Sequence, residues 1–261
     1  MITSLSNDRV KRVRALQSRR SARRKVNQFV IEGSRLLDEA VKANIPIVEV
    51  YYTESFAESD DGVSLLEAVS VQGAAALSVD EAVMIDMSDT KTPQGILAVL
   101  PFLALPAPDQ TAFALIVDGI SDPGNLGTIM RSAVAAGVPL MITTSGTVDL
   151  YNPKVLRGAM GAHFYLATQQ LSWPGIANRL DQHAIFVADS YEGAAYYQID
   201  WTQPCALIVS EEAHGASQEA RATAHAAITI PMIGPVDSLN VAMASSVLLF
   251  ERVRQLAQAG L

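Results

Sequence analysis

Apolar runs and amphipathic stretches alternate along the chain, and polar residues gather where the apolar runs end. In the C-terminal half, the runs 113–117 and 205–209 are almost continuously apolar. Such runs are typical of strands in a parallel sheet that helices cover on both faces. We therefore predict an α/β fold with a parallel sheet over 112–261. Further strands are expected at 138–143, 185–188 and 227–230, and helices at 126–136, 152–157 and 240–256.

The first hundred residues show the same alternation on a smaller scale, which predicts a second, smaller α/β domain over 25–100. Residues 1–24 predict a basic helical arm, in which Val10, Val13 and Leu16 form a short apolar stripe. The stretch 101–111 is rich in proline and alanine, and we expect it to be a linker because clustered prolines interrupt helices and central strands. The smaller domain should hold strands at 28–34, 45–52, 75–78 and 95–100, and helices at 35–42, 64–71 and 79–87.

The charges are distributed unevenly, and this changes the picture of the arm. The net charge is −8, yet nine of the 19 basic residues lie within the first 25 positions, where only Asp8 opposes them. A polyanion responds to the local patch because salt screens charges beyond about 8–10 Å. We predict that the arm contacts RNA; the alternative is a solvated helix face. The candidate contacts are Arg9, Lys11, Arg12, Arg23 and Arg24.

Composition excludes several other classes of protein. No apolar run reaches the ~20 residues of a membrane span, and no apolar stretch follows the basic N-terminus as it would in a secretory signal. The single Cys205 lies within an apolar run, and the four histidines show no metal-ligand spacing. We expect a cytoplasmic protein with no membrane partner and no metal.

Three polar segments of the C-terminal half stand at the ends of apolar runs, where ligands bind in open α/β sheets. A glycine-rich turn such as the one at 123–127 is a weak signal alone, and it does not match the dinucleotide fingerprint G-x-G-x-x-G. Arg131 could be a surface ion-pairing residue, and Ser238 could be a helix N-cap. The segments are Asp118-Gly-Ile-Ser-Asp-Pro-Gly-Asn-Leu-Gly-Thr-Ile-Met-Arg131, Leu207-Ile-Val-Ser-Glu-Glu-Ala-His-Gly215 and Ile230-Pro-Met-Ile-Gly-Pro-Val-Asp-Ser-Leu-Asn-Val-Ala-Met-Ala-Ser-Ser246.

Together and in this order, the segments resemble motifs 1, 2 and 3 of the SpoU (TrmH-like) RNA ribose 2′-O-methyltransferases, which belong to the SPOUT superfamily. The stretches 29–33 and 90–99 resemble the substrate-binding domain of the same family. The resemblance implies a deep trefoil knot, S-adenosyl-L-methionine as cofactor, and a homodimer that acts on structured RNA without a metal. A full N-terminal domain favours ribosomal RNA. The alternatives are a tRNA 2′-O-methyltransferase and an RNA-binding relative that has lost catalysis.

The resemblance also implies roles for particular residues. Because a guanidinium with a pKa above about 12 stays protonated, we expect Arg131 to stabilise the developing ribose alkoxide, and we leave the general base open. Ser210 stands where the family usually has glycine, so its side chain could crowd the cofactor. Arg157 matches a family arginine near the RNA. The implied catalytic residues are Asn125, Arg131, Glu212, Ser238 and Asn240, and the implied cofactor-binding residues are Ser210, Ile230, Met232 and Leu239.

Overall fold

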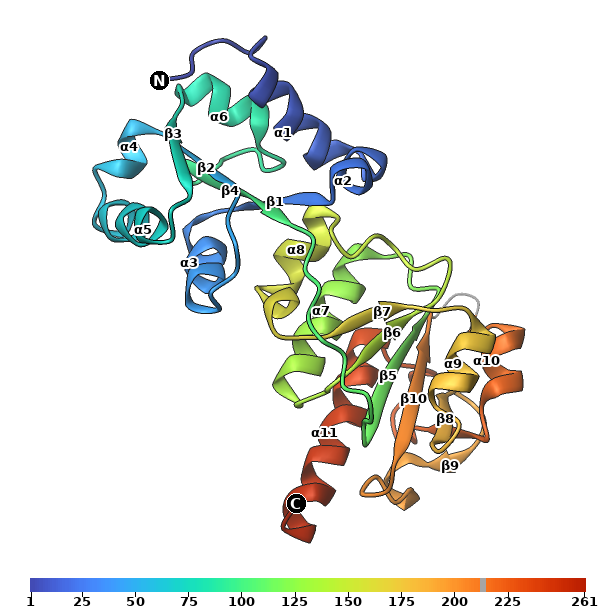
Figure 1. The fold of residues 1–261 in the computed structure, drawn as a ribbon. Coiled ribbons are helices and arrows are strands. Elements are labelled where there is room, and N and C mark those ends of the chain that lie inside the picture. The colour runs from blue at the N-terminus through green and yellow to red at the C-terminus, as the bar shows by residue number, and fades with distance from the viewer. Residues whose placement is uncertain (212–214) are drawn as a thin grey trace. The chain divides into compact units, whose positions relative to one another are not determined.

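The computed structural model describes residues 1–211 and 215–261, and these residues form two compact units (Figure 1). Unit 1 comprises residues 1–103 together with 149–164. Unit 2 comprises residues 104–148 and 165–261. The sequence division assigned residues 149–164 to the C-terminal domain, and it treated 1–24 as a separate arm and 101–111 as a linker; in the structure, unit 1 contains the first two of these stretches, and the third is divided between the units after residue 103.

Unit 1 is built on a four-stranded mixed sheet with the strand order β1-β4-β2-β3. Strand β4 (Ile96–Pro101) runs antiparallel to β1 (Gln28–Glu32) and β2 (Glu49–Tyr52), and β3 (Ala75–Ser78) lies parallel to β2. Alternate residues of β4 enter two separate cores, because successive side chains of a strand point to opposite faces. The helices of this unit are α1 (Asp8–Ser18), α2 (Arg20–Val26), α3 (Ser34–Lys42), α4 (Glu54–Ala57), α5 (Asp60–Val71), α6 (Glu81–Met87) and α8 (Pro153–Ala159), with a 3-10 turn at Ala162–Phe164.

The predicted N-terminal arm is an integral part of unit 1. The stripe of Val10, Val13 and Leu16 on α1 is fully buried in one of the two cores, where it packs with apolar residues of α6. The apolar stripe at helical spacing therefore marks a core-facing helix. Deleting residues 1–24 would remove part of the hydrophobic core together with the basic side chains.

Arg23 was predicted to contact RNA, and the structure corrects this prediction. Its side chain is buried, with a relative exposure of 3%. The guanidinium donates to the carbonyls of Leu16 and Gln17, at 2.7 and 3.1 Å, and forms a 2.6 Å ion pair with Asp149. Arg23 thus ties α2 to the end of α1, and its charge is used inside the fold.

The segment 149–164 joins unit 1 because its apolar side chains find partners there. Leu156 and Phe164 are buried in the same core as Phe29 and Ile31. The ring of Tyr151 stacks on Phe102, with centroids 4.2 Å apart. The periodicity of 152–157 predicted the helix, but not which core would bury it.

Unit 2 contains a seven-stranded parallel sheet with the order β7-β6-β5-β10-β8-β11-β9, which confirms the predicted parallel α/β architecture. All residues of β5 are buried, and β10 beside it is buried except at its last residue. The strands are β5 (Phe113–Asp118), β6 (Met141–Thr143), β7 (Thr168–Gln170), β8 (Ala184–Ala188), β9 (Ala194–Ala195), β10 (Cys205–Ser210) and β11 (Ala226–Thr229). The helices are α7 (Pro123–Ala135), α9 (Trp173–Arg179), α10 (Gln218–Thr223) and α11 (Val241–Ala259), and a 3-10 turn spans Tyr196–Gln198.

Two helix starts differ from the sequence prediction, and both are explained by capping. Helix α7 begins at Pro123, because the Asp122 side chain accepts from the Asn125 amide at 2.7 Å. Asn125 is therefore in the first turn of the helix. The N-cap of α11 is Asn240 and not Ser238.

Within the described part of the chain, no helix is long and apolar enough to cross a membrane.

One buried histidine makes the stability of unit 1 depend on pH. The Nε2–H of His163 donates to the Leu150 carbonyl at 2.7 Å, and Nδ1 is buried with no hydrogen-bond partner among the described residues. Burial lowers the pKa of His163 from 6.5 to about 4. The folded chain therefore holds this ring neutral at a pH where the unfolded chain protonates it.

The free energy of unfolding should fall as the pH drops from about 6.5 towards 4, because the unfolded state binds more protons in this range. At pH 5.5 the contribution of His163 is a loss of about 1.4 kcal/mol. Urea unfolding followed by circular dichroism at pH 7.5 and 5.5 measures this loss. The variant His163→Gln should have a flatter profile than the wild type and than a His183→Gln control; an unchanged slope would contradict the assignment.

Candidate functional site

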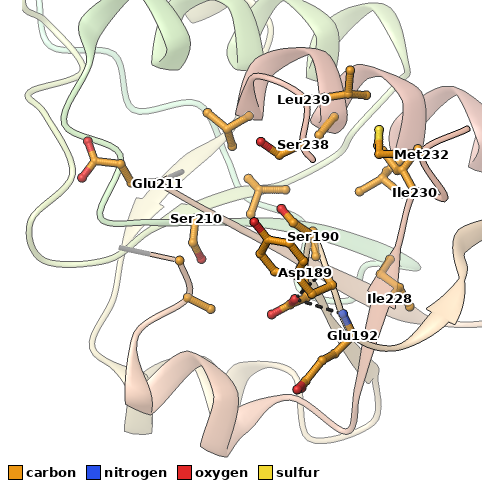
Figure 2. Close-up of a pocket in the computed structure, with 18 of the residues that line it drawn as sticks. Asp189, Ser190, Glu192, Ser210, Glu211, Ile228, Ile230, Met232, Ser238 and Leu239 are labelled. Carbon is orange, nitrogen blue, oxygen red and sulfur yellow. Dashed lines mark hydrogen bonds between the residues drawn. The ribbon is translucent and has the colours of Figure 1, made fainter. Parts of the chain in front are cut away.

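A pocket of about 460 Å³ opens in unit 2 at the carboxyl ends of β8, β10 and β11. Its walls come from described residues of four chain segments: 188–192, 209–211 with 215–216, 228–232 and 238–248. Carboxyl ends of neighbouring parallel strands form the edge where open α/β sheets bind ligands. The second and third polar segments of the sequence therefore meet at one site, and Figure 2 shows them facing each other across it.

All four predicted cofactor residues line this pocket. Ser210 lies at the end of β10, Ile230 and Met232 follow β11, and Leu239 precedes α11 (Figure 2). Ser238 lines the pocket as well. The site thus combines an apolar wall with a few hydroxyl groups and with the charged side chains of Asp189, Glu192, Glu211 and Arg221. Apolar surface with a small number of polar groups is usual for a small-molecule site.

The buried carboxylate of Asp118 contacts residues at both ends of the segment that follows β10. Its Oδ1 accepts a hydrogen bond of 2.9 Å from the Thr144 hydroxyl, and its Oδ2 accepts one of 3.0 Å from the Ser217 amide. The Ser210 hydroxyl approaches the same Oδ2 at 3.5 Å. These four residues, named here the Asp118 cluster, fix the ends of the segment that follows β10. The sequence pattern marked Asp118 as polar but not as the centre of these contacts.

The segment after β8 adds pocket residues that the sequence analysis missed. Asp189 accepts from the amides of Tyr191 and Glu192 and forms a 2.7 Å ion pair with Arg221 of α10. Burial works to raise the pKa of Asp189, but the Tyr191 amide, the Arg221 guanidinium and the Glu192 amide together hold it below its ordinary value. The sequence does contain a signal for Asp189, because this aspartate directly follows the apolar run 185–188. Ligand-binding residues of open α/β sheets lie at such strand ends.

The first and third polar segments meet at a direct side-chain contact. Nδ2 of Asn240 donates to Oδ1 of Asn125 at 2.9 Å, while Oδ1 of Asn240 caps α11 by accepting from the amides of Ala242 and Met243. A second contact, between the hydroxyls of Ser132 and Ser246 at 2.7 Å, joins the same two helices. Asn240 therefore caps its own helix and also positions Asn125.

The remaining predicted catalytic residues are placed differently. Arg131 is exposed on α7 and does not line the pocket formed by the described residues. Glu212 lies outside the residues that the structure describes. Its neighbour Glu211 lines the pocket and accepts a hydrogen bond from the Ser121 hydroxyl. Gly215 has φ +65°, a conformation that favours glycine, and its amide donates to the Glu211 carbonyl at 2.9 Å.

The predicted RNA contacts lie in unit 1, and most of them form ion pairs. Arg9 and Arg12 both reach the buried carboxylate of Glu49, and Lys11 lies 3.3 Å from Asp8. Arg157 pairs with Asp89 at 2.8 Å, and Arg24 is exposed. The pairs of Lys11 and Arg157 are exposed to solvent and therefore weak, so a phosphate can compete for these two side chains. Among the described residues, no group of three potential metal ligands is found.

Comparison with known proteins identifies both parts of the chain. Residues 112–250 match the SpoU rRNA Methylase family, and residues 7–98 match the MRM3-like substrate binding domain. The 23S rRNA (guanosine(2553)-2′-O)-methyltransferase RlmP of Bacillus subtilis is 31% identical, over 95% of this chain and 97% of its own length. The mitochondrial rRNA methyltransferase 3 of Mus musculus is also 31% identical, over 95% of this chain and 72% of its own.

A solved structure of the same kind superposes on almost the whole chain. The SpoU methyltransferase AviRb from Streptomyces viridochromogenes, in complex with the cofactor AdoMet, gives a TM-score of 0.87 at 26% identity. The match covers 96% of this chain and 98% of AviRb. The sequence motifs, the pocket at the edge of the parallel sheet and these matches lead to one conclusion: the chain belongs to the SpoU rRNA methylase family.

Proposed function

We propose that the protein transfers the methyl group of S-adenosyl-L-methionine to a ribose 2′-hydroxyl of ribosomal RNA. The observation that carries the proposal is the pocket at the carboxyl edge of the sheet, because residues of the second and third family motifs line it together. The relatives named as rRNA methyltransferases match both units, including the substrate-binding domain. This favours ribosomal RNA over the alternative of tRNA.

The residues of the pocket fit this cofactor. Ile230, Met232 and Leu239 offer an apolar surface for the adenine, and the hydroxyls of Ser190, Ser210 and Ser238 offer hydrogen-bonding groups for its polar parts. A volume of about 460 Å³ lies within the range of small-molecule sites. When bound, the cofactor supplies an electrophilic methyl group on a sulfonium, so the reaction needs alignment and a nucleophile and no metal.

Side chains outside the pocket act on the RNA or hold the helices that carry the site. Exposed on α7, Arg131 can meet the RNA and stabilise the ribose oxygen as it gains negative charge. The bond between Asn125 and Asn240 holds α7 against the start of α11, which keeps Arg131 at a fixed place relative to the cofactor wall. Arg9, Lys11, Arg12, Arg24 and Arg157 supply positive charge for the phosphates of the RNA.

Two finer features of the family are part of the proposal. We place the trefoil knot around the segment 230–240, which leads from β11 into α11. We also propose a homodimer that covers α11, because Met243, Val247 and Phe250 expose apolar surface at helical spacing. Light scattering that gives the mass of a single chain would contradict the homodimer.

We also propose that the protein is cytoplasmic.

The competing hypothesis is an RNA-binding relative without catalysis, and it rests on Ser210. In the structure the Ser210 hydroxyl approaches Asp118, so the side chain has a polar partner at the pocket wall. The sequence retains the five implied catalytic residues, Asn125, Arg131, Glu212, Ser238 and Asn240. This combination favours an active enzyme.

The variant Arg131→Ala should lose methyl transfer while it binds S-adenosylhomocysteine within twofold of the wild type. We expect kcat to fall more than tenfold, a loss of at least about 1.4 kcal/mol of transition-state stabilisation. Transfer of labelled methyl from S-adenosyl-L-methionine to 23S rRNA, followed by alkaline hydrolysis to detect 2′-O-methylated dinucleotides, measures the reaction. Arg179→Ala, which loses hydrogen bonds to the carbonyls of Pro108 and Asp109, is the matched control. A variant that keeps more than about a tenth of the wild-type rate would remove Arg131 from the mechanism.

Calorimetric titration with S-adenosylhomocysteine tests the pocket itself. Leu239→Asp should lose more than about tenfold in affinity, because it places a charge against an apolar ligand face. Ser210→Gly should bind as well as the wild type or slightly better, since it only opens the wall. Unchanged binding by Leu239→Asp would show that the cofactor lies on other loops. A wild-type protein that binds no S-adenosylhomocysteine would favour the RNA-binding alternative.

A further inference from the structure

Glu211 connects the wall of the pocket to the loop that leads into helix α7. The residue lines the pocket, and its carboxylate accepts a hydrogen bond from the Ser121 hydroxyl. Figure 2 shows this carboxylate directed away from Ser190 and Ser238 on the other walls. The main chain of Glu211 is held as well, because its carbonyl accepts from the Gly215 amide at 2.9 Å. A group that fills the pocket therefore contacts one side of a residue whose other side holds Ser121.

Ser121 lies in the short loop between β5 and α7. The backbone of this loop is fixed by the segment that follows β6, which does not line the pocket formed by the described residues. The Gly119 amide donates to the Thr144 hydroxyl at 3.2 Å, and the Ile120 carbonyl accepts from the Val148 amide at 2.9 Å. Ser121 itself is exposed, and its hydroxyl gives the loop a hydrogen bond to the pocket wall.

The same loop sets the start of the helix that carries Arg131. Ser121 is adjacent to Asp122, whose side chain caps α7 by accepting from the Asn125 amide at 2.7 Å. Arg131 follows about two and a half turns after this cap. A continuous hydrogen-bonded helix passes a displacement of its first turn on to later residues. The position of Ser121 therefore bears on the position of Arg131.

We infer that Ser121 is a positioning residue for methyl transfer. Its bond to Glu211 ties the helix of Arg131 to the cofactor wall, so that occupation of the pocket fixes the arginine in place. The inference rests on the proposed function, which gives Arg131 its role at the ribose and S-adenosyl-L-methionine its place in the pocket. A second link runs from Asn240 to Asn125. Loss of Ser121 should therefore weaken the arrangement without abolishing it.

Hydrogen exchange measured by mass spectrometry tests this link without any RNA. In the wild type, S-adenosylhomocysteine should protect backbone amides of the loop 119–124 and of the pocket segment 230–240. Ser121→Ala, at an exposed position, should fold normally, lose the protection of 119–124 and keep that of 230–240. Ser121→Thr keeps the hydroxyl and should restore the protection. Ser172→Ala is the matched control, because Ser172 is exposed in the same unit and makes no side-chain bond to its helix.

Methyl transfer to 23S rRNA gives a second readout. Ser121→Ala should lower kcat about tenfold, or about 1.4 kcal/mol, because Arg131 is less firmly placed. Its affinity for S-adenosylhomocysteine should stay within about twofold of the wild type, since the residues that line the pocket are unchanged. Ser121→Thr should restore the rate. In a Glu211→Ala background, Ser121→Ala should cause no further loss of kcat, because its partner is already absent.

The outcomes distinguish the inference from the proposed function. Equal protection of 119–124 in Ser121→Ala and in the wild type would overturn the inference, and so would additive losses of kcat in the double variant. Wild-type protein that is protected at 230–240 but not at 119–124 would also contradict the inference, while the cofactor assignment stands. A wild type without protection in either region would contradict the cofactor assignment itself, and the inference with it.

Discussion

The pocket of unit 2 depends on a single buried carboxylate. Asp118 ends strand β5, and its two oxygens accept from Thr144, Ser217 and Ser210, which lie after β6, before α10 and at the end of β10. A buried charge is tolerated only when such partners surround it. The Asp118 cluster therefore fixes the two ends of the segment after β10, at Ser210 and Ser217, beside one wall of the pocket. The ion pair of Asp189 and Arg221 performs the corresponding task for the segment after β8.

The other side of the site depends on contacts between α7 and α11. The bonds Asn125–Asn240 and Ser132–Ser246 join the first and third motifs, so the residue proposed to activate the ribose and the wall proposed to hold the cofactor share one rigid support. Catalysis of methyl transfer requires this kind of fixed geometry, because the acceptor oxygen must be held in line with the methyl group. We therefore propose a positioning role for the two asparagines, in addition to the capping of α11 by Asn240.

The sequence predicted the features that follow from periodicity and from strand ends. Continuous apolar runs gave β5 and β10 of the parallel sheet, and Ser210, Ile230, Met232 and Leu239 indeed meet around one pocket. The features that the sequence could not predict depend on contacts between residues far apart in the chain. Arg23 is as basic as its neighbours and differs only through its burial beside Asp149, and the packing of Leu156 in unit 1 depends on which core accepts it.

The substitution Asp118→Asn tests the central claim most directly, because it keeps the shape of the side chain and leaves one oxygen acceptor for its several donors. Titration with S-adenosylhomocysteine should show a loss of affinity of about tenfold or more, with a smaller loss for Thr144→Val, which removes one of the contacts. Circular dichroism should show that the parallel sheet is retained. Wild-type affinity in a folded Asp118→Asn protein would contradict the account, because the pocket would then be organised without the buried carboxylate.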